Sequence, residues 1–160
     1  MRKMRKLSFK RREEHRTDYK ARLNILKGGN KRLIVRKSNK YILAQIAESK
    51  EGQDKILCEA TTMEFKDKIK ELKSLKNIFI AYNLGKLIAK KATALGIKEA
   101  IVDIGINRST KGSRIYAVLN GAIDGGLKIP HNEKNFPSKE RLNGEHIKPE
   151  IKNKIKDLVK

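Results

Sequence analysis

The stretch from Asp103 to Arg114, DIGINRSTKGSR, has the residue types of a phosphate-binding loop. It follows the apolar run KEAIV, typical of an inner strand of a sheet, and leads into IYAVLNGAIDGG, which has the pattern of a helix. A loop between a strand end and a helix start offers free backbone N–H groups and the positive end of the helix dipole. Ser109, Thr110 and Ser113 can donate hydrogen bonds, and Arg108, Lys111 and Arg114 add charge. The loop is therefore predicted to hold phosphate oxygens. The alternative is that Ser113 only caps the helix while the basic side chains face water.

The phosphate could belong to ATP. Asp103-Ile104-Gly105 resembles the first phosphate loop of sugar kinases and actin-like ATPases. Those proteins also need a second acidic loop and an adenosine site spread over two lobes, and this sequence supplies neither. A Walker loop requires G-x-x-x-x-G-K-[ST], whereas Thr110-Lys111-Gly112 has these elements in the wrong order. Asp103 is therefore expected to order the loop rather than to bind magnesium.

The sequence contains only weak evidence for other catalytic or metal-binding sites. His131 with Glu133, and Glu145 with His146, lie in irregular sequence without a third ligand at helical spacing, so surface or capping roles are favoured. Cys58 is the single cysteine, which excludes an internal disulfide and indicates a small apolar residue on a strand. We predict no catalytic residue, no metal, no cofactor and no small-molecule substrate.

Charge points to a polyanionic partner. The 160 residues carry a formal net charge of +21, with a pI near 10.2. Residues 1–40 hold sixteen Lys and Arg against three acids, whereas residues 41–126 hold fourteen against ten. This distribution indicates a basic arm on a globular body. No apolar run approaches the roughly 20 residues that span a bilayer, so nucleic acid is favoured over a membrane and a cytoplasmic protein is expected.

The arm and the first half of the body contain a helix and three strands. Residues 1–16 show almost no apolar periodicity and are expected to be disordered until RNA binds. A helix should start at Thr17 or Asp18 and end at Gly28-Gly29. Strands are predicted over 32–37, 41–48 and 54–62, with Ser38-Asn39-Lys40 as a tight hairpin turn and Glu51-Gly52-Gln53 as a second turn.

The second half alternates helices with one strand. Residues 63–72 have a short helical pattern, and a longer helix should run from an Asn77 cap to Gly96. Its apolar face is predicted to be Ile80, Leu84, Leu87, Ile88, Ala92 and Leu95. A strand covered on both faces is expected over 99–106, followed by a helix over 114–124 that buries one stripe.

These elements predict an α/β fold with a small mixed sheet, formed by an antiparallel meander plus a crossover strand, and helices packed on it. The expected organisation is a basic N-terminal arm with a short helix (1–30), a globular RNA-binding domain (31–126) and a C-terminal segment (127–160). That last segment should run extended over a surface and close as a short helix from Pro149.

Three stretches, beginning RTDYKARLNILKGGNKRLIVRKSNKY, EAIVDIGINRSTKGSR and FPSKERLNGEHI, occur in the order found in one family. The chain closely resembles the archaeal version of the large-subunit ribosomal proteins that bind 5S ribosomal RNA, the L-eighteen family. The resemblance runs from about Arg11 to Ile147. It implies an α/β fold and a place in the central protuberance of the cytoplasmic large ribosomal subunit. The implied partners are 5S and 23S ribosomal RNA and neighbouring large-subunit proteins, with no catalysis.

The resemblance also implies which residues contact RNA, because in this family the basic N-terminal segment and the glycine-containing loops do so. Carried over by position, these are Arg11, Arg12, Arg16, Tyr19 and Arg22 in the arm, Arg36, Lys37, Ser38, Asn39 and Lys40 at the hairpin, and Arg108, Thr110, Lys111, Ser113 and Arg114 in the loop. Tyr19 and Tyr41 are equally compatible with base stacking and with a place in the core. A general RNA- or DNA-binding chaperone or compaction protein is the alternative function, with a nucleotide hydrolase as a third.

Overall fold

A four-stranded mixed sheet forms the centre of the molecule. The computed structural model describes residues 8–50, 53–69, 74–145 and 147–159. The strands β1 (Arg32–Lys37), β2 (Ile42–Lys50) and β3 (Gln53–Thr61) form an antiparallel meander, and β4 (Ile101–Asp103) pairs parallel to β1. The strand order is therefore β3-β2-β1-β4. This confirms the predicted α/β fold with a meander and one crossover strand.

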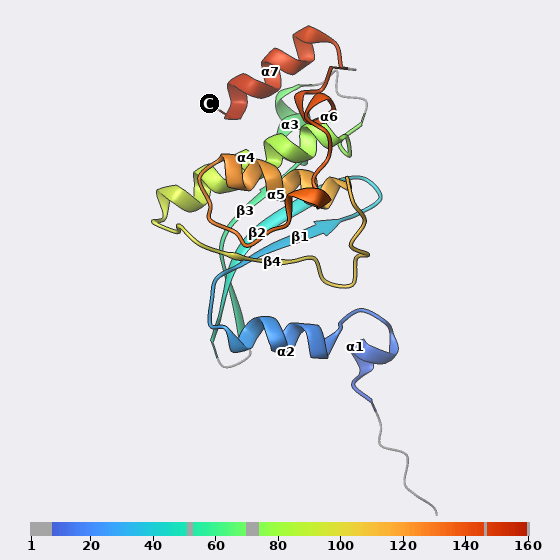
Figure 1. Cartoon of the computed structure of the whole chain (residues 1–160), viewed down its shortest axis with the longest axis vertical. Helices are drawn as coiled ribbons and strands as arrows, with labels where there is room; N and C mark the ends of the chain where they lie inside the picture. Colours follow the sequence, from blue (N-terminus) through green and yellow to red (C-terminus); the bar gives the residue numbers. More distant parts are fainter. Residues whose placement is uncertain (1–7, 51–52, 70–73, 146, 160) are drawn as a thin grey trace, which may run out of the picture.

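Two long helices cover one face of the sheet. They are α4 (Ile78–Ala94), which Asn77 caps as predicted, and α5 (Arg114–Asp124). The other helices are α1 (Lys10–Glu13), α2 (Tyr19–Lys27), α3 (Met63–Lys68), a 3-10 turn η1 (Glu133–Asn135), α6 (Lys139–Asn143) and α7 (Pro149–Val159). In Figure 1, α1 and α2 lie at the opposite end of the long axis from α7, on the side of the sheet away from α4 and α5. Within the described ranges, no helix is long and apolar enough to cross a membrane.

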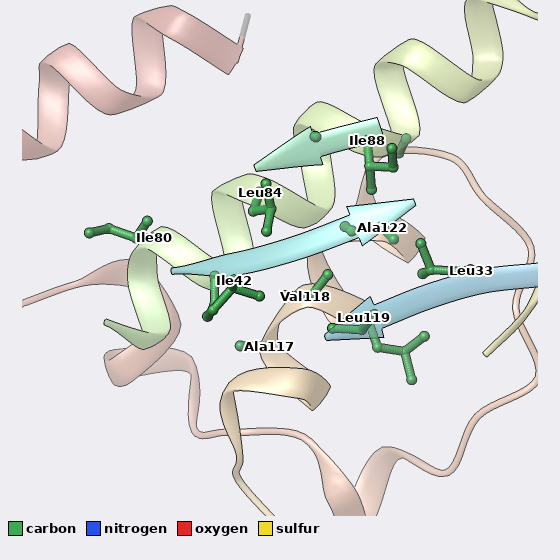
Figure 2. Close-up of a cluster of buried hydrophobic side chains, with 14 of the residues drawn as sticks. Leu33, Ile42, Ile80, Leu84, Ile88, Ala117, Val118, Leu119 and Ala122 are labelled. Carbon is green, nitrogen blue, oxygen red and sulfur yellow. The ribbon is translucent and has the colours of Figure 1, made fainter. Parts of the chain in front are cut away.

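The core lies between the sheet and the α4–α5 layer. Side chains alternate between the two faces of a strand, and Leu33, Val35, Ile42, Ala44 and Ile46 are all buried. Figure 2 shows sheet residues such as Leu33 and Ile42 beside Leu84 and Ile88 of α4 and Val118 of α5. This alternation places Ile42, Ala44 and Ile46 of β2 in the core, whereas Leu43 and Gln45 are only half-buried. It also sends Arg32, Ile34 and Arg36 of β1 to the opposite face.

Two glycines allow α4 and α5 to approach closely. A Cβ on Gly121 would lie 1.9 Å from the carbonyl oxygen of Tyr82, and a Cβ on Gly85 would lie 2.1 Å from the carbonyl oxygen of Val118. Neither distance is possible for a real side chain, so backbone packs on backbone where the helices cross. This close approach brings the apolar stripes of both helices onto the sheet together.

Several predicted details differ from the structure. The strand expected over 99–106 as an inner strand is only Ile101–Asp103 and lies at the sheet edge, with Ile101 and Val102 half-buried. It ends early because the chain turns at Gly105, whose φ is +60°. Leu95, predicted on the apolar face of α4, is 56% exposed because the helix has ended by that residue. The helix predicted over 63–72 ends at Lys68, and residues 70–73 lie outside the described part of the chain, as do Glu51 and Gly52 of the second predicted turn.

The chain beyond α5 returns to the body. Leu127 and Ile129 are buried, and Lys128 forms a bridge to Glu99 beside β4. The helices α6 and α7 both pack on α4, and Ile155 of α7 is fully buried. The α7 helix begins at Pro149, where a helix start was predicted. The sequence pattern did not predict η1 and α6, because both are too short to show apolar periodicity.

Candidate nucleic-acid interface

The sheet face opposite α4 and α5 carries a buried charge cluster. Arg32 is only 1% exposed, and its Nη1 donates to Asp103 Oδ2 at 2.9 Å. Arg36 donates through Nη2 to Asp103 Oδ1 at 2.9 Å and through Nη1 to the Asp103 carbonyl oxygen at 2.7 Å. Asp103, at the end of β4, therefore holds two arginines of the neighbouring strand β1.

Asp54 extends this cluster to the arm. Its Oδ1 lies 2.6 Å from Arg32 Nη2, and its Oδ2 accepts from Arg22 Nη2 at 2.8 Å. The result is an alternating chain of charges, Arg22–Asp54–Arg32–Asp103–Arg36, which we call the arginine–aspartate chain. It joins α2, β3, β1 and β4, and its two ends are arginines predicted to bind RNA.

The electrostatics of Asp54 follow from these contacts. Partial burial by itself would raise the pKa of the Asp54 carboxyl group. Hydrogen bonds from Ser49 and Arg32, together with the positive charges of Arg32 and Arg22, outweigh that effect. The pKa of Asp54 is therefore lowered from its ordinary value of 3.8, and the carboxylate stays charged at neutral pH.

Asp103 also shapes the start of the predicted phosphate loop. Its Oδ1 accepts a hydrogen bond from the Gly105 N–H at 2.8 Å. A Cβ on Gly105 would lie 2.9 Å from Arg36 Cζ, and the positive φ disfavours any side chain there. The loop start is thus fixed by Asp103 and packed against the Arg36 guanidinium. Asp103 orders the loop, as the sequence indicated.

A groove of about 680 Å³ lies between the arm and this loop. The arm contributes one wall, and the end of β1 (Arg36 and Lys37) together with residues 102–107 contributes the other. Its basic lining residues are Arg11, Arg16, Arg22, Arg36 and Lys37. These five, predicted in two separate segments, are therefore brought together in space.

The described part of the arm is more ordered than predicted. Residues 1–7 lie outside the described ranges, but α1 forms a helical turn and Phe9 packs on the Tyr19 ring at 5.0 Å. Asp18 caps α2 by accepting from the N–H groups of Lys20 and Ala21. Arg11 Nε donates to Thr17 Oγ1 at 3.0 Å. The expectation of disorder over residues 1–16 is wrong for the described residues, because these aromatic and polar contacts compensate for the missing apolar pattern.

This surface continues along the arm through Arg12, Arg16 and Tyr19. Arg16 is exposed and pairs with Glu14 at 3.2 Å. Arg12 lines a neighbouring hollow with Tyr19 and Ile106, and Ile106 is 61% exposed. Tyr19 is half-buried, and its ring is therefore shared between packing on Phe9 and the hollow.

The hairpin residues divide into two groups. Ser38, Asn39 and Lys40 form the turn between β1 and β2, where Ser38 Oγ accepts from the N–H groups of Lys40 and Tyr41. None of these three turn residues lines the groove. Lys37 lines both the groove and a second hollow, so it connects the two basic surfaces.

The second hollow lies at the start of α5. It is lined by Lys37, Ile78, Gly112, Ser113, Arg114, Ile115 and Arg141. Ser113 occupies the cap position of α5, but its side chain makes no capping bond and its Oγ is buried with no partner among the described residues. The interpretation of Ser113 as a plain helix cap therefore fails. Arg108, Thr110 and Lys111 are exposed on the same loop but line neither hollow.

Metal ligands do not gather anywhere in the described ranges. Across the part of the chain that the structure covers, no three His, Cys, Asp or Glu side chains are placed to hold a metal ion. His146, one of the candidates considered from the sequence, lies outside the described residues.

Comparison with known proteins decides the family. A family model described as "Ribosomal large subunit proteins 60S L5, and 50S L18" matches residues 3–98 and 95–132. The chain is also 45% identical over 142 residues to large ribosomal subunit protein uL18 of Caldivirga maquilingensis, which covers 89% of this chain and 69% of that protein. The chain belongs to this family. The uL18 of Methanoregula boonei is 41% identical over 96% of the chain and 87% of the relative, and that of Korarchaeum cryptofilum is 42% identical over 89% and 72%.

Membership in the uL18 family makes this chain a protein of the cytoplasmic large ribosomal subunit. The predicted family is confirmed, and the matched residues include the arm, the hairpin and the loop. The basic groove is therefore a feature of a ribosomal protein, whose surroundings are rich in RNA phosphate.

Sequence reasoning missed three residues of this surface. Arg32 was placed on a strand without a role, although an arginine beside the apolar run LIV is a signal for a buried ion pair. Nothing in the sequence indicated a role for Asp54, because its partners Arg22 and Arg32 lie far from it in the chain and only the fold brings them together. Arg141 lies in a segment predicted to be extended, and α6 turns it toward the second hollow.

Proposed function

We propose that this chain binds 5S ribosomal RNA and helps to attach it to 23S ribosomal RNA in the central protuberance. Its role is structural, with no catalytic step. The observation that carries the proposal is the groove in which Arg11, Arg16 and Arg22 of the arm face Arg36 and Lys37 of the sheet. A groove with basic side chains along both walls suits a phosphate backbone.

Affinity in this proposal comes mainly from charge. Each Lys or Arg that neutralises a phosphate releases counterions, so binding weakens steeply as salt rises. Arginine can also contact phosphate through two N–H groups or stack on an unpaired base, which lysine cannot do. RNA is recognised largely by shape, 2′-hydroxyls and unpaired bases. Aromatic residues are 5% of the chain and tryptophan is absent, which favours backbone contacts over extensive base stacking.

The predicted RNA contacts fall into two sets in this proposal. The groove set is Arg11, Arg16, Arg22, Arg36 and Lys37, and Arg12 and Tyr19 extend it along the arm. The outer set is Ser38, Asn39 and Lys40 at the turn with Arg108, Thr110, Lys111, Ser113 and Arg114 on the loop. Lys37 lines both the groove and the second hollow, so in this proposal the two sets are neighbouring parts of one RNA-binding surface.

The three-part organisation fits the same proposal. The arm (1–30) and the body (31–126) provide the RNA surface. Residues 127–160 end at α7, at the opposite end of the long axis from the arm (Figure 1). We assign that end to neighbouring large-subunit proteins.

A binding assay tests the proposal. The purified chain should bind 5S ribosomal RNA in moderate salt more tightly than an unrelated RNA of the same length. Equal affinity for both RNAs would refute specific recognition and support the general nucleic-acid chaperone instead. ATP turnover with magnesium, measured on the same sample, would support a nucleotide hydrolase and contradict a purely structural role.

A further inference from the structure

The arm has little apolar packing to hold it on the body. The helix α2 has no buried residue, and its half-buried residues are Tyr19, Arg22, Ile25 and Leu26. Because so little apolar surface is covered, the hydrophobic effect contributes little to the position of this helix. The described polar link between α2 and the body is the ion pair from Arg22 to Asp54.

Asp54 is itself fixed from the body side. Its Oδ1 accepts from Ser49 Oγ and lies 2.6 Å from Arg32 Nη2. Arg32 is 1% exposed and is held in turn by Asp103 at 2.9 Å. Through this buried arginine, the carboxylate of Asp54 is anchored to the same aspartate that orders the start of the loop.

We propose that Asp54 is a positioning residue, which docks α2 on the body before RNA binds and so sets the spacing between the two walls of the groove. The proposal rests on the proposed RNA-binding function, because it concerns the geometry of that same groove. Docking the arm in advance lowers the conformational entropy lost on binding. Asp54 thereby links the arm wall of the groove to the loop wall.

The proposal and simple electrostatics predict opposite effects of removing Asp54 on RNA affinity. Asp54 is an acid beside a surface meant for phosphate, so by electrostatics its removal should strengthen RNA binding. If Asp54 positions the arm, its removal should weaken binding. Asp67 provides the matched control, since it is an exposed acid on α3 for which the structure records no ion pair or hydrogen bond within the described residues.

The first experiment needs no RNA. Nitroxide labels are placed on Leu23→Cys in α2 and Lys98→Cys on the body, in a Cys58→Ser background, and the distance distribution is measured by pulsed electron paramagnetic resonance. The full chain should give one narrow distribution, and Asp54→Asn should broaden it. Arg22→Gln, which leaves the body side of the arginine–aspartate chain intact, should broaden it too. An unchanged narrow distribution in both variants would overturn the proposal.

The second experiment measures 5S ribosomal RNA binding at one moderate salt concentration. Asp54→Asn should weaken affinity about tenfold relative to Asp67→Asn, and Asp54→Glu should recover part of the loss because it restores a carboxylate. Asp54→Asn binding as tightly as Asp67→Asn, or more tightly, would overturn the proposal. If the unmodified chain shows no preference for 5S ribosomal RNA, the proposed function fails. The distance measurement on the free chain then still decides whether Asp54 positions the arm.

Discussion

Replacement of Gly121 by alanine tests the helix crossing on which the body depends. The new Cβ would lie 1.9 Å from the Tyr82 carbonyl oxygen and 2.8 Å from its carbonyl carbon. A comfortable carbon–oxygen contact is about 3.3 Å, so α5 must move by about 1.4 Å relative to α4. Because the obstacle is helix backbone, no side-chain rotation can relieve it.

The expected change in the free energy of unfolding results from two opposing effects. A gap of about 1 Å forfeits up to roughly half of the dispersion energy between facing atoms, and overpacking of this kind costs about 3 kcal/mol. Alanine in the middle of a helix is favoured over glycine by about 1 kcal/mol. The free energy of unfolding should therefore fall by about 2 kcal/mol, with a melting temperature lower by roughly 4 to 8 °C.

Urea and thermal denaturation followed by far-ultraviolet circular dichroism measure this change. Gly28→Ala is the matched control, because Gly28 has a φ of −75° and its added Cβ would approach nothing closer than 3.4 Å. It should leave stability nearly unchanged. If Gly121→Ala were as stable as the unmodified chain, or more stable, the close crossing of α4 and α5 would be refuted.

Three further predictions concern the loop and the arginine–aspartate chain. Arg108→Ala combined with Lys111→Ala should lower the slope of log affinity against log salt for RNA by about 1.5, with an unchanged melting temperature because both side chains are exposed; a large loss of stability would mean that the loop is structural. Asp103→Asn should lower the free energy of unfolding by about 3 kcal/mol, since it removes an ionic partner of the buried Arg32, and a loss below about 1 kcal/mol in urea denaturation would contradict this role. Because the pKa of Asp54 is lowered from 3.8, its contribution to stability should be complete above about that pH and be lost as pH falls further, so the melting-temperature difference between the unmodified chain and Asp54→Asn should shrink in acid; a difference that grows in acid would refute the pairing.

The fold was predictable where a local pattern determined it. The apolar runs at 32–37 and 41–48, which flank a turn, predicted β1 and β2, and the Asn77 cap predicted the start of α4. The crossover to β4 followed from a helix between two strands. The length of β4 did not follow, because the turn at Gly105 depends on a hydrogen bond from its N–H to the Asp103 side chain.

The site was predictable in composition but not in arrangement. The arm, hairpin and loop were expected to contact RNA, yet nothing in the sequence indicated that Arg22 and Arg36 end one chain of ion pairs. Its links join residues far apart in the sequence, such as Arg32 and Asp103. Such pairs become visible only when tertiary packing brings the strands together. The same limit applies to the glycine contact between α4 and α5.

The most direct test of the central claim follows the chain through ribosome extraction. Large ribosomal subunits are sedimented from cells that produce the chain and are then treated to release 5S ribosomal RNA, and the chain is quantified in each fraction. We predict that the chain sediments with the large subunit and leaves it together with 5S ribosomal RNA. A chain that stays on the 23S ribosomal RNA core after 5S ribosomal RNA has left, or that never sediments with the subunit, would contradict the proposed function.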